Sequence, residues 1–227
     1  KISPVGLANF TDSYSVTDET AGASGILVRS QDMHEMDFDE SLLAVARAGA
    51  GVNNIPLEKC AEHGIVVFNT PGANANAVKE LVIAGLFLAA RNIPAGISWA
   101  QTLTENVGKT VEKGKGQFAG HEIKGKTLGV IGLGAIGVMV ANTARDLGMN
   151  VAGYDPFLGV KAAHNLYSCV EIKDSIGAVV SGCDFVSVHV PAMASTSGMI
   201  NADVFAAMKD GAVLLNFSRD KLVNETD

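Results

Sequence analysis

Three glycines, spaced Gly-x-Gly-x-x-Gly between a strand-like and a helix-like segment, constrain the fold of this chain more than any other feature. They are Gly132, Gly134 and Gly137. The preceding residues, 127–131, are mostly apolar, as in a buried strand. The following residues show apolar positions at helical spacing as far as Gly148, which can end a helix. A strand, a tight glycine turn and a helix in this order indicate a βαβ unit of a parallel α/β sheet.

Each glycine of this turn has its own steric reason to be glycine. Gly132 allows the tight turn, Gly134 lets the backbone approach a pyrophosphate, and Gly137 lets the helix pack closely on the strand. A pyrophosphate would lie at the N-terminus of the helix, where unpaired N–H groups and the helix dipole favour an anion. The turn therefore predicts a Rossmann-type, doubly wound parallel sheet that binds a dinucleotide.

An acidic residue follows the next strand-like segment, which covers residues 150–154. Asp155 stands 18 residues after Gly137, where a carboxylate can accept hydrogen bonds from the ribose hydroxyls of NAD. The same charge would repel the 2′-phosphate of NADP, and no Arg follows at once to offset it. We therefore expect NAD as the cofactor.

The alternation of strand and helix continues through the chain. We expect a long helix over residues 76–91 and further strands at residues 24–30, 65–68, 185–189 and 213–216. The sequence Asn92-Ile93-Pro94 ends or kinks the long helix. We therefore place a domain boundary there, with domains over residues 1–92 and 93–227. Residues 95–119 are too many for a simple linker.

Composition argues against several classes of function. The net charge of −7, with no basic cluster, speaks against nucleic acid and anionic membranes as partners. The longest apolar run, residues 81–90, is too short to span a bilayer and is typical of a buried core helix. Cys60, Cys169 and Cys183 lack metal-binding spacing, so we expect no metal site, free thiols and a cytoplasmic location.

Two further strand ends carry polar groups. His189-Val190-Pro191 follows one strand, and Arg219 follows another. The carboxyl ends of strands line the ligand crevice of a doubly wound sheet, so His189 can face the cofactor; a hydrogen-bonded structural histidine is the equal alternative. An Arg at such an end can bind a carboxylate bidentately, and a surface salt bridge is its alternative role.

The order of these motifs resembles that of the D-isomer-specific 2-hydroxyacid dehydrogenases, over nearly the whole chain. Besides the glycine turn, the resemblance rests on residues 26–30, 47–54, 68–74, 154–156, 188–191 and 216–219. Within the family, the motifs look most like those of enzymes that oxidise D-3-phosphoglycerate with NAD by hydride transfer, the first step of serine biosynthesis. The resemblance implies a flavodoxin-like substrate-binding half-domain in residues 1–92. It also implies an NAD-binding Rossmann domain in residues 93–227, and a homodimer in which residues 95–119 form an arm.

The resemblance also implies roles for individual residues. Arg219 is implied to be catalytic, binding the carboxylate of the substrate. The residues implied to contact the substrate are Arg29, Ser30, Arg47, Ala50, Gly51 and Asn74. The residues implied to contact NAD are Gly132, Gly134, Ala135, Ile136, Gly137, Asp155, His189, Val190, Pro191, Phe217, Ser218 and, from the first domain, Ala50.

The chain departs from the family pattern in two places. Asp220 and Lys221 follow Arg219 where the family has Gly, so Asp220 can compete for the guanidinium. No histidine here matches the acid–base His of the family, and the Glu that orients that His is also unmatched. We therefore expect a chain cut at both ends that binds NAD but does not turn over efficiently. The alternatives are a dehydrogenase of another 2-hydroxyacid (glycerate or hydroxypyruvate, lactate, 2-hydroxyglutarate) and a non-catalytic, NAD-sensing relative of a corepressor.

Overall fold

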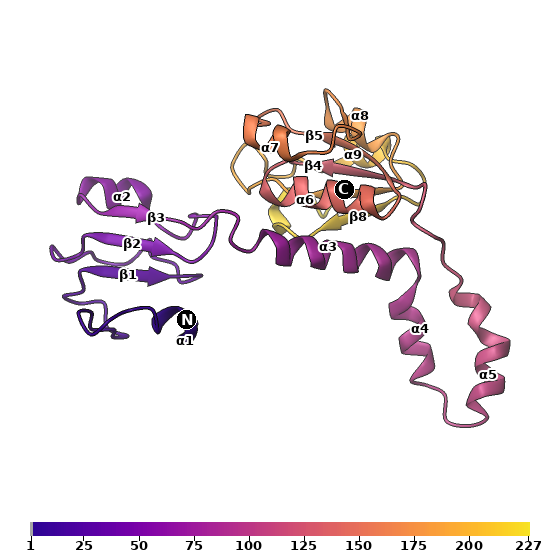
Figure 1. Ribbon diagram of the computed structural model, residues 1–227, viewed down its shortest axis with the longest axis horizontal. Coiled ribbons are helices and arrows are strands. Elements are labelled where there is room, and N and C mark those ends of the chain that lie inside the picture. Colours follow the sequence, from indigo (N-terminus) through magenta and orange to yellow (C-terminus); the bar gives the residue numbers. More distant parts are fainter. Residues whose placement is uncertain (1) are drawn as a thin grey trace. The chain divides into compact units, whose positions relative to one another are not determined.

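The computed structural model describes residues 2–227, and the chain divides into two compact α/β units, Lys1–Asn74 and Ala75–Asp227 (Figure 1). The first unit has three parallel strands in the order β1-β2-β3. They are β1 (Gly25–Val28), β2 (Ala44–Arg47) and β3 (Val66–Phe68). The helix α2 (Leu57–Glu62) connects β2 to β3, and the short α1 (Pro4–Leu7) precedes the sheet. Three parallel strands are too few to establish a flavodoxin-like domain, so this assignment stays a prediction.

The two faces of this small sheet differ. Ile26, Val45 and Val67 lie side by side in register and face a core that includes Cys60 of α2. On the other face, Leu27 and Phe68 lie in one row and are 41% and 57% exposed. Parallel sheets are ordinarily covered on both faces, so the first unit presents an open apolar sheet face.

The second unit has a five-stranded parallel sheet in the order β6-β5-β4-β7-β8. The strands are β4 (Thr127–Ile131), β5 (Asn150–Tyr154), β6 (Glu171–Ile172), β7 (Phe185–Val188) and β8 (Val213–Asn216). Counted from β4, this is the order 3-2-1-4-5 of a Rossmann sheet, which confirms the predicted doubly wound fold. The sequence did not predict β6, because two exposed residues carry no apolar pattern. The strand order reverses between β4 and β7, where such sheets open a ligand crevice.

Helices cover both faces of this second sheet. The helices α3 (Ala75–Ala90) and α6 (Ala135–Asp146) pack on one face, in a core that includes Phe185. The helices α8 (Ile176–Val180) and α9 (Ala202–Ala207) pack on the other, around Val186 and Val188. Successive residues of β7 therefore point to opposite cores, as a fully buried parallel strand requires. A further helix, α7 (Val160–Asn165), follows β5, and a 3-10 turn, η2 (Asp220–Leu222), follows β8.

The long helix α3 packs with the second unit, although the sequence placed it at the end of the first domain. Its fully buried Val82 and Leu86 belong to the same core as α6 and the sheet of the second unit. The boundary between the two compact units therefore falls between Asn74 and Ala75 in the sequence, earlier than the boundary expected near residue 93. Which domain binds substrate and which binds cofactor is a separate question, and that assignment stays a prediction.

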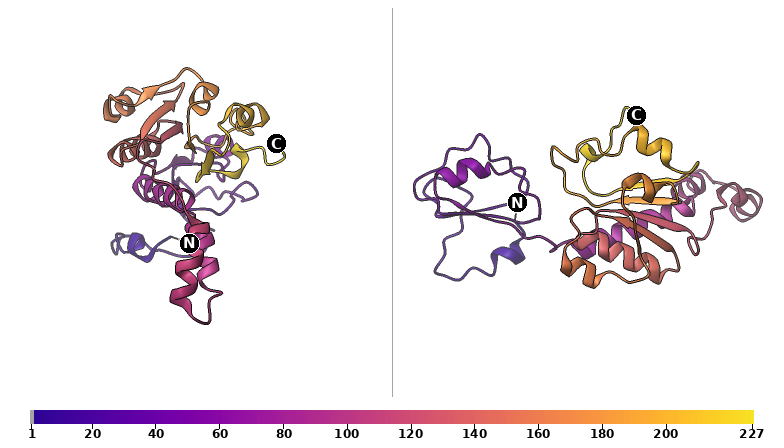
Figure 2. Two further views of the ribbon diagram at one scale, coloured as in Figure 1. Left: turned by 90° about the vertical axis from the view of Figure 1, so that its right-hand side faces the viewer. Right: turned by 90° about the horizontal axis from the view of Figure 1, so that it is seen from above.

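The residues between α3 and β4 form a helical arm. It consists of α4 (Ile93–Ala100), α5 (Val107–Gly114) and a 3-10 turn, η1 (Lys115–Phe118), and none of its helical residues is buried. The ring centroids of Trp99 and Phe118 lie 5.2 Å apart, and this contact joins α4 to η1. Figure 2 shows the arm standing away from the sheet of its own unit.

No single helix among the described residues is long and apolar enough to cross a membrane. Only α3 and α4 taken together have the length and apolar composition of a membrane span, and the chain bends by 67° between them. The apolar character of α3 has a local explanation, because this helix packs in the core of the second unit.

The three cysteines carry free thiols in the described structure. Cys60 and Cys183 are buried in the two units, and Cys169 is exposed. Burial raises the pKa of the Cys183 thiol to about 11. Within residues 2–227, no group of three or more His, Cys, Asp or Glu side chains is placed to hold a metal ion.

Candidate functional site

The turn between β4 and α6 has the close packing that a dinucleotide cradle requires. Gly132 has φ +92°, and a Cβ there would lie 2.8 Å from the carbonyl carbon of His189 and from Cγ1 of Val190. A Cβ on Gly137 would collide with the carbonyl oxygen of Gly132. Only glycine therefore fits these two positions, one against the end of β7 and the other where α6 meets β4.

Gly134 is different, because its surroundings are open. Nothing lies within 4 Å of a Cβ built on Gly134, and both Gly134 and Ala135 are exposed. Gly134 is the N-cap residue of α6, and no side chain caps this helix. The first N–H groups of α6 are therefore available to an anion. This open shelf at a helix N-terminus fits the pyrophosphate of NAD.

Asp155 is joined to the same turn. Its Oδ2 accepts a hydrogen bond from the backbone N–H of Leu133 at 2.8 Å, and its Oδ1 accepts one from Phe157 at 2.8 Å. Leu133 itself packs over Gly153, with side-chain atoms 3.0 Å from where a Cβ would be. Each carboxylate oxygen keeps a second lone pair for a ribose hydroxyl. The sequence predicted the ribose role of Asp155 but missed its hold on the glycine turn.

The side chain of His189 turns into the second unit. Its Nε2 lies 2.9 Å from Oγ of Ser187, which is fully buried. Its Nδ1 is also buried and has no hydrogen-bond partner among the described residues. Burial lowers the pKa of His189 to about 4, so the ring is neutral at pH 7. This arrangement favours the structural alternative for the side chain. A cofactor contact through the residue stays a prediction.

The turn after β8, residues 216–219, is held by its own polar side chains. Asn216 Oδ1 accepts from the N–H of Ser218 at 3.0 Å, and Asn216 Nδ2 donates to the carbonyl of Arg219 at 2.8 Å. Ser218 Oγ donates to the carbonyl of Val188 at 2.9 Å, which ties the turn to the end of β7. Arg219 is exposed, and within the described residues no ion pair joins it to Asp220. The expected competition from Asp220 is thus not observed.

The first unit gathers its predicted substrate residues at the carboxyl edge of its sheet. Arg29 and Ser30 follow β1, and Arg47 ends β2 and is followed by the turn containing Ala50 and Gly51. Arg47 Nε donates to the carbonyl of Arg29 at 3.0 Å. Asn69 and Asn74 come after β3, and Asn69 Nδ2 donates to the carbonyl of Ala50 at 2.8 Å.

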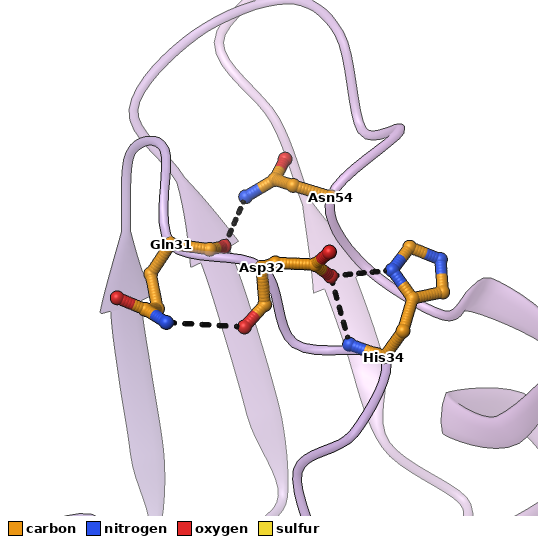
Figure 3. A network of polar contacts seen from close by, with 4 residues as sticks. All are labelled: Gln31, Asp32, His34 and Asn54. Carbon is orange, nitrogen blue, oxygen red and sulfur yellow. Dashed lines mark hydrogen bonds and ion pairs between the residues drawn. The ribbon is translucent and has the colours of Figure 1, made fainter.

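A small polar network joins the loops that follow β1 and β2 (Figure 3). Asn54 Nδ2 donates to the carbonyl of Gln31 at 2.7 Å, so the loop carrying Ser30 is fixed to the loop carrying Gly51. Asp32 Oδ1 accepts from the backbone N–H of His34 at 3.0 Å and lies 2.6 Å from its Nδ1. These hydrogen bonds lower the pKa of the exposed Asp32 carboxyl. The sequence does not predict this network, because the hydrogen bond of Asn54 joins loops that follow different strands.

Two hollows of about 270 Å³ and 180 Å³ lie elsewhere on the second unit. The smaller is lined by Lys126, Asp184 and Ala212, which come just before β4, β7 and β8. These hollows therefore lie toward the amino ends of the strands, and neither includes a residue of the glycine turn. We place the site at the carboxyl ends, because the glycine geometry fits a ligand there.

Residues 83–227 match the NAD-binding domain of the D-isomer specific 2-hydroxyacid dehydrogenases. The chain belongs to this family. NAD is therefore the cofactor of the second unit, and one similar solved structure, a 3-phosphoglycerate dehydrogenase from Entamoeba histolytica, was determined with NAD⁺ bound.

Curated relatives of this chain are named D-3-phosphoglycerate dehydrogenase, and two of them illustrate the similarity. The protein from Methanocaldococcus jannaschii is 39% identical over 82% of this chain. The protein from Homo sapiens is 35% identical over 91% of this chain. The chain covers only 34% and 37% of these two relatives, so it spans about a third of their length.

The fold of the chain is also that of solved family structures. D-mandelate dehydrogenase from Rhodotorula graminis, in its holo form, matches with a TM-score of 0.73 and 30% identity over 83% of this chain. The Entamoeba histolytica enzyme matches with a TM-score of 0.66 and 28% identity over 90% of this chain. The match covers 54% and 58% of those two chains.

Replacing Gly134 with Ala should weaken NADH binding while leaving the domain folded. A methyl group there meets no protein atom but projects into the open shelf, so we expect the Kd for NADH in a fluorescence titration to rise at least about tenfold, or about 1.4 kcal/mol. Gly177→Ala is the matched control, since Gly177 also has open surroundings but lies on α8. An unchanged Kd for Gly134→Ala would contradict the assignment of the cradle.

The neutral, buried state of His189 should make stability depend on pH. Because its folded pKa of about 4 lies below the ordinary 6.5, this contribution to stability is complete above pH 6.5 and is lost as the pH falls toward 4. The loss between pH 6.5 and pH 5 should be about 1.6 kcal/mol in the free energy of unfolding by urea. His189→Gln should remove this loss, whereas His164→Gln, at an exposed position, should keep it. Equal pH dependence in wild type and His189→Gln would be evidence against this account.

Proposed function

We propose that this chain carries the NAD-binding part, and a portion of the substrate-binding part, of an enzyme that oxidises D-3-phosphoglycerate to 3-phosphohydroxypyruvate. One observation carries the catalytic side of the proposal. The turn bearing Arg219 is bonded to the carbonyl of Val188, and Gly132 packs against His189, the next residue. An arginine and a dinucleotide cradle thus meet at the end of β7, as a hydride transfer to NAD needs.

The roles of the residues follow from the chemistry. NAD, when bound, accepts the hydride from C2 of the substrate. The N-terminus of α6 binds the pyrophosphate, and Asp155 holds the ribose. Arg219 binds the carboxylate of the substrate and so orients C2 toward the nicotinamide. The hydroxyl proton needs a base of near-neutral pKa. His189 does not fit that role, because its pKa is about 4 and Ser187 occupies its Nε2.

Two observations favour D-3-phosphoglycerate as the substrate. The relatives at 39% and 35% identity carry that name. In the first unit, Arg29 and Arg47 lie at one sheet edge, where positive charge suits a phosphate although the chain as a whole is negative. A dehydrogenase of an unphosphorylated 2-hydroxyacid is the second candidate, favoured by the structural match to D-mandelate dehydrogenase. Ser30, Ala50, Gly51 and Asn74 are proposed to complete the substrate contacts.

A homodimer also belongs to this proposal. The arm exposes apolar side chains, with Ile97 53% and Val107 47% exposed. Apolar residues on a projecting element suit burial against a partner, and a second copy of the chain is the partner that the family resemblance implies.

Asp155 should set the preference for NAD over NADP. Its negative charge repels a 2′-phosphate, so Asp155→Asn should bring the Kd values of NADH and NADPH closer together in parallel titrations. Asn is the sharper substitution than Ala, since its side-chain oxygen can keep one of the two loop hydrogen bonds. Wild-type protein that binds NADPH as tightly as NADH would overturn the proposed preference.

Turnover on a panel of 2-hydroxyacids, using the full-length natural protein, tests the proposed activity. We expect D-3-phosphoglycerate to have the highest kcat/KM. Arg219→Ala should raise KM and lower kcat, with a loss of about 1.5–3 kcal/mol in kcat/KM, or about ten- to a hundredfold. Lys161→Ala, an exposed position on α7, is the control. Unchanged kinetics for Arg219→Ala would reduce Arg219 to a surface residue, and no turnover on any substrate would favour an NAD-sensing role.

A further inference from the structure

The ring of Phe217 packs into a notch on α3 formed by Gly85. A Cβ built on Gly85 would lie 2.6 Å from Cζ and 2.9 Å from Cε2 of Phe217. These distances are well below ordinary van der Waals contact, so the ring occupies the space that any other residue at position 85 would fill. Phe217 is partly buried and packs against the same core as α3. The ring of Phe217 is therefore engaged with α3, and the NAD contact implied for this residue stays a prediction.

The rest of the turn is fixed by polar contacts alone. Asn216 bonds to both Ser218 and Arg219, and Ser218 bonds to the end of β7. These bonds shape the turn and tie it to one neighbouring strand. The Phe217 ring is its apolar anchor, and it connects the turn to α3. Arg219 follows two residues later, and Nη1 of its guanidinium donates to the carbonyl of the neighbouring Ser218 at 2.9 Å.

We propose that Gly85 and Phe217 are positioning residues for Arg219, because the ring in the notch sets where the turn, and with it the guanidinium, stands above the sheet. The proposal rests on the proposed role of Arg219 as the carboxylate-binding group. A Cβ at position 85 would lie 2.6 Å from Cζ of Phe217, so the ring would have to move by about 0.8 Å to reach an ordinary contact distance of about 3.4 Å. Displacements of about 1 Å at a site that orients a substrate can cost about a hundredfold in rate.

Three properties separate positioning from general stability. Gly85 lies on α3 and Phe217 in the turn after β8. The dinucleotide cradle is the glycine turn after β4, residues 132–137, so NADH binding should be unchanged. A shorter side chain at position 217 should make room for the methyl group at position 85. A similar clash placed elsewhere should lower stability without changing substrate binding. Gly129 offers this control, because its Cβ would lie 2.7 Å from Val179 and 3.0 Å from Cys183 Sγ, on the α8 side of β4.

The test uses the full-length protein with a 2-hydroxyacid and NAD, and NADH fluorescence for the cofactor Kd. Gly85→Ala should raise the KM for the 2-hydroxyacid at least about fivefold, with the NADH Kd changed less than about twofold. Adding Phe217→Leu to Gly85→Ala should return KM toward the wild-type value, although Phe217→Leu alone should raise it. Such non-additivity is the signature of two residues in direct contact. Gly129→Ala should lower the unfolding midpoint and leave KM unchanged.

Several outcomes would overturn the proposal. These are an unchanged KM in Gly85→Ala, a KM that the double variant does not recover, and an NADH Kd that rises as much as KM. If Gly85→Ala does not fold, Phe217→Leu alone decides: a raised KM with an unchanged NADH Kd supports positioning, and a raised NADH Kd makes Phe217 a cofactor contact instead. Arg219→Lys in the same assay separates the two proposals. An unchanged KM there overturns both, whereas a raised KM with an inert Gly85→Ala overturns positioning alone.

Discussion

The second unit depends on the close contact between the glycine turn after β4 and the carboxyl end of β7. Gly132 has room for no side chain because His189 and Val190 lie against it. The carbonyl of Val188, one residue earlier, receives the hydroxyl of Ser218. One strand end therefore holds the cradle on one side and the arginine-bearing turn on the other. Since the strand order reverses between β4 and β7, this is also where the sheet leaves room for a ligand.

Charge near this strand end is arranged locally, against a chain that is negative overall. The uncapped N-terminus of α6 attracts an anion through its N–H groups and its dipole. Asp155 carries a negative charge close to this anion site. Its two carboxylate oxygens accept hydrogen bonds from the backbone N–H groups of Leu133 and Phe157, which partly offset that charge. His189 adds no charge at pH 7, because burial keeps its ring neutral. Arg219 is exposed near this end of the sheet, where we propose that it binds a carboxylate.

Side-chain packing gives several residues structural roles that their chemistry alone does not reveal. Phe217 is a residue that the family resemblance implies to contact NAD, and its ring fills the notch at Gly85. Ser187 is a small polar residue in a buried strand, and its hydroxyl partners the ring of His189. Leu133 lies inside the glycine motif, and its backbone N–H binds Asp155. The partners of Phe217 and Leu133 lie far away in sequence, whereas Ser187 and His189 are two residues apart and meet at the end of β7.

The sequence by itself determined the βαβ unit, the cofactor and the family. Local steric rules make the spacing of Gly132, Gly134 and Gly137 specific, and Asp155 falls at a distance that one helix and one strand require. The tertiary structure alone decided that α3 packs with the second unit, that His189 turns inward, and that Phe217 meets Gly85. The physical reason is range. Strand and helix patterns repeat within a few residues and can be read along the chain. The packing of α3 and the contact of Phe217 with Gly85 join positions separated by many residues, and the burial of His189 depends on the layers that assemble around β7.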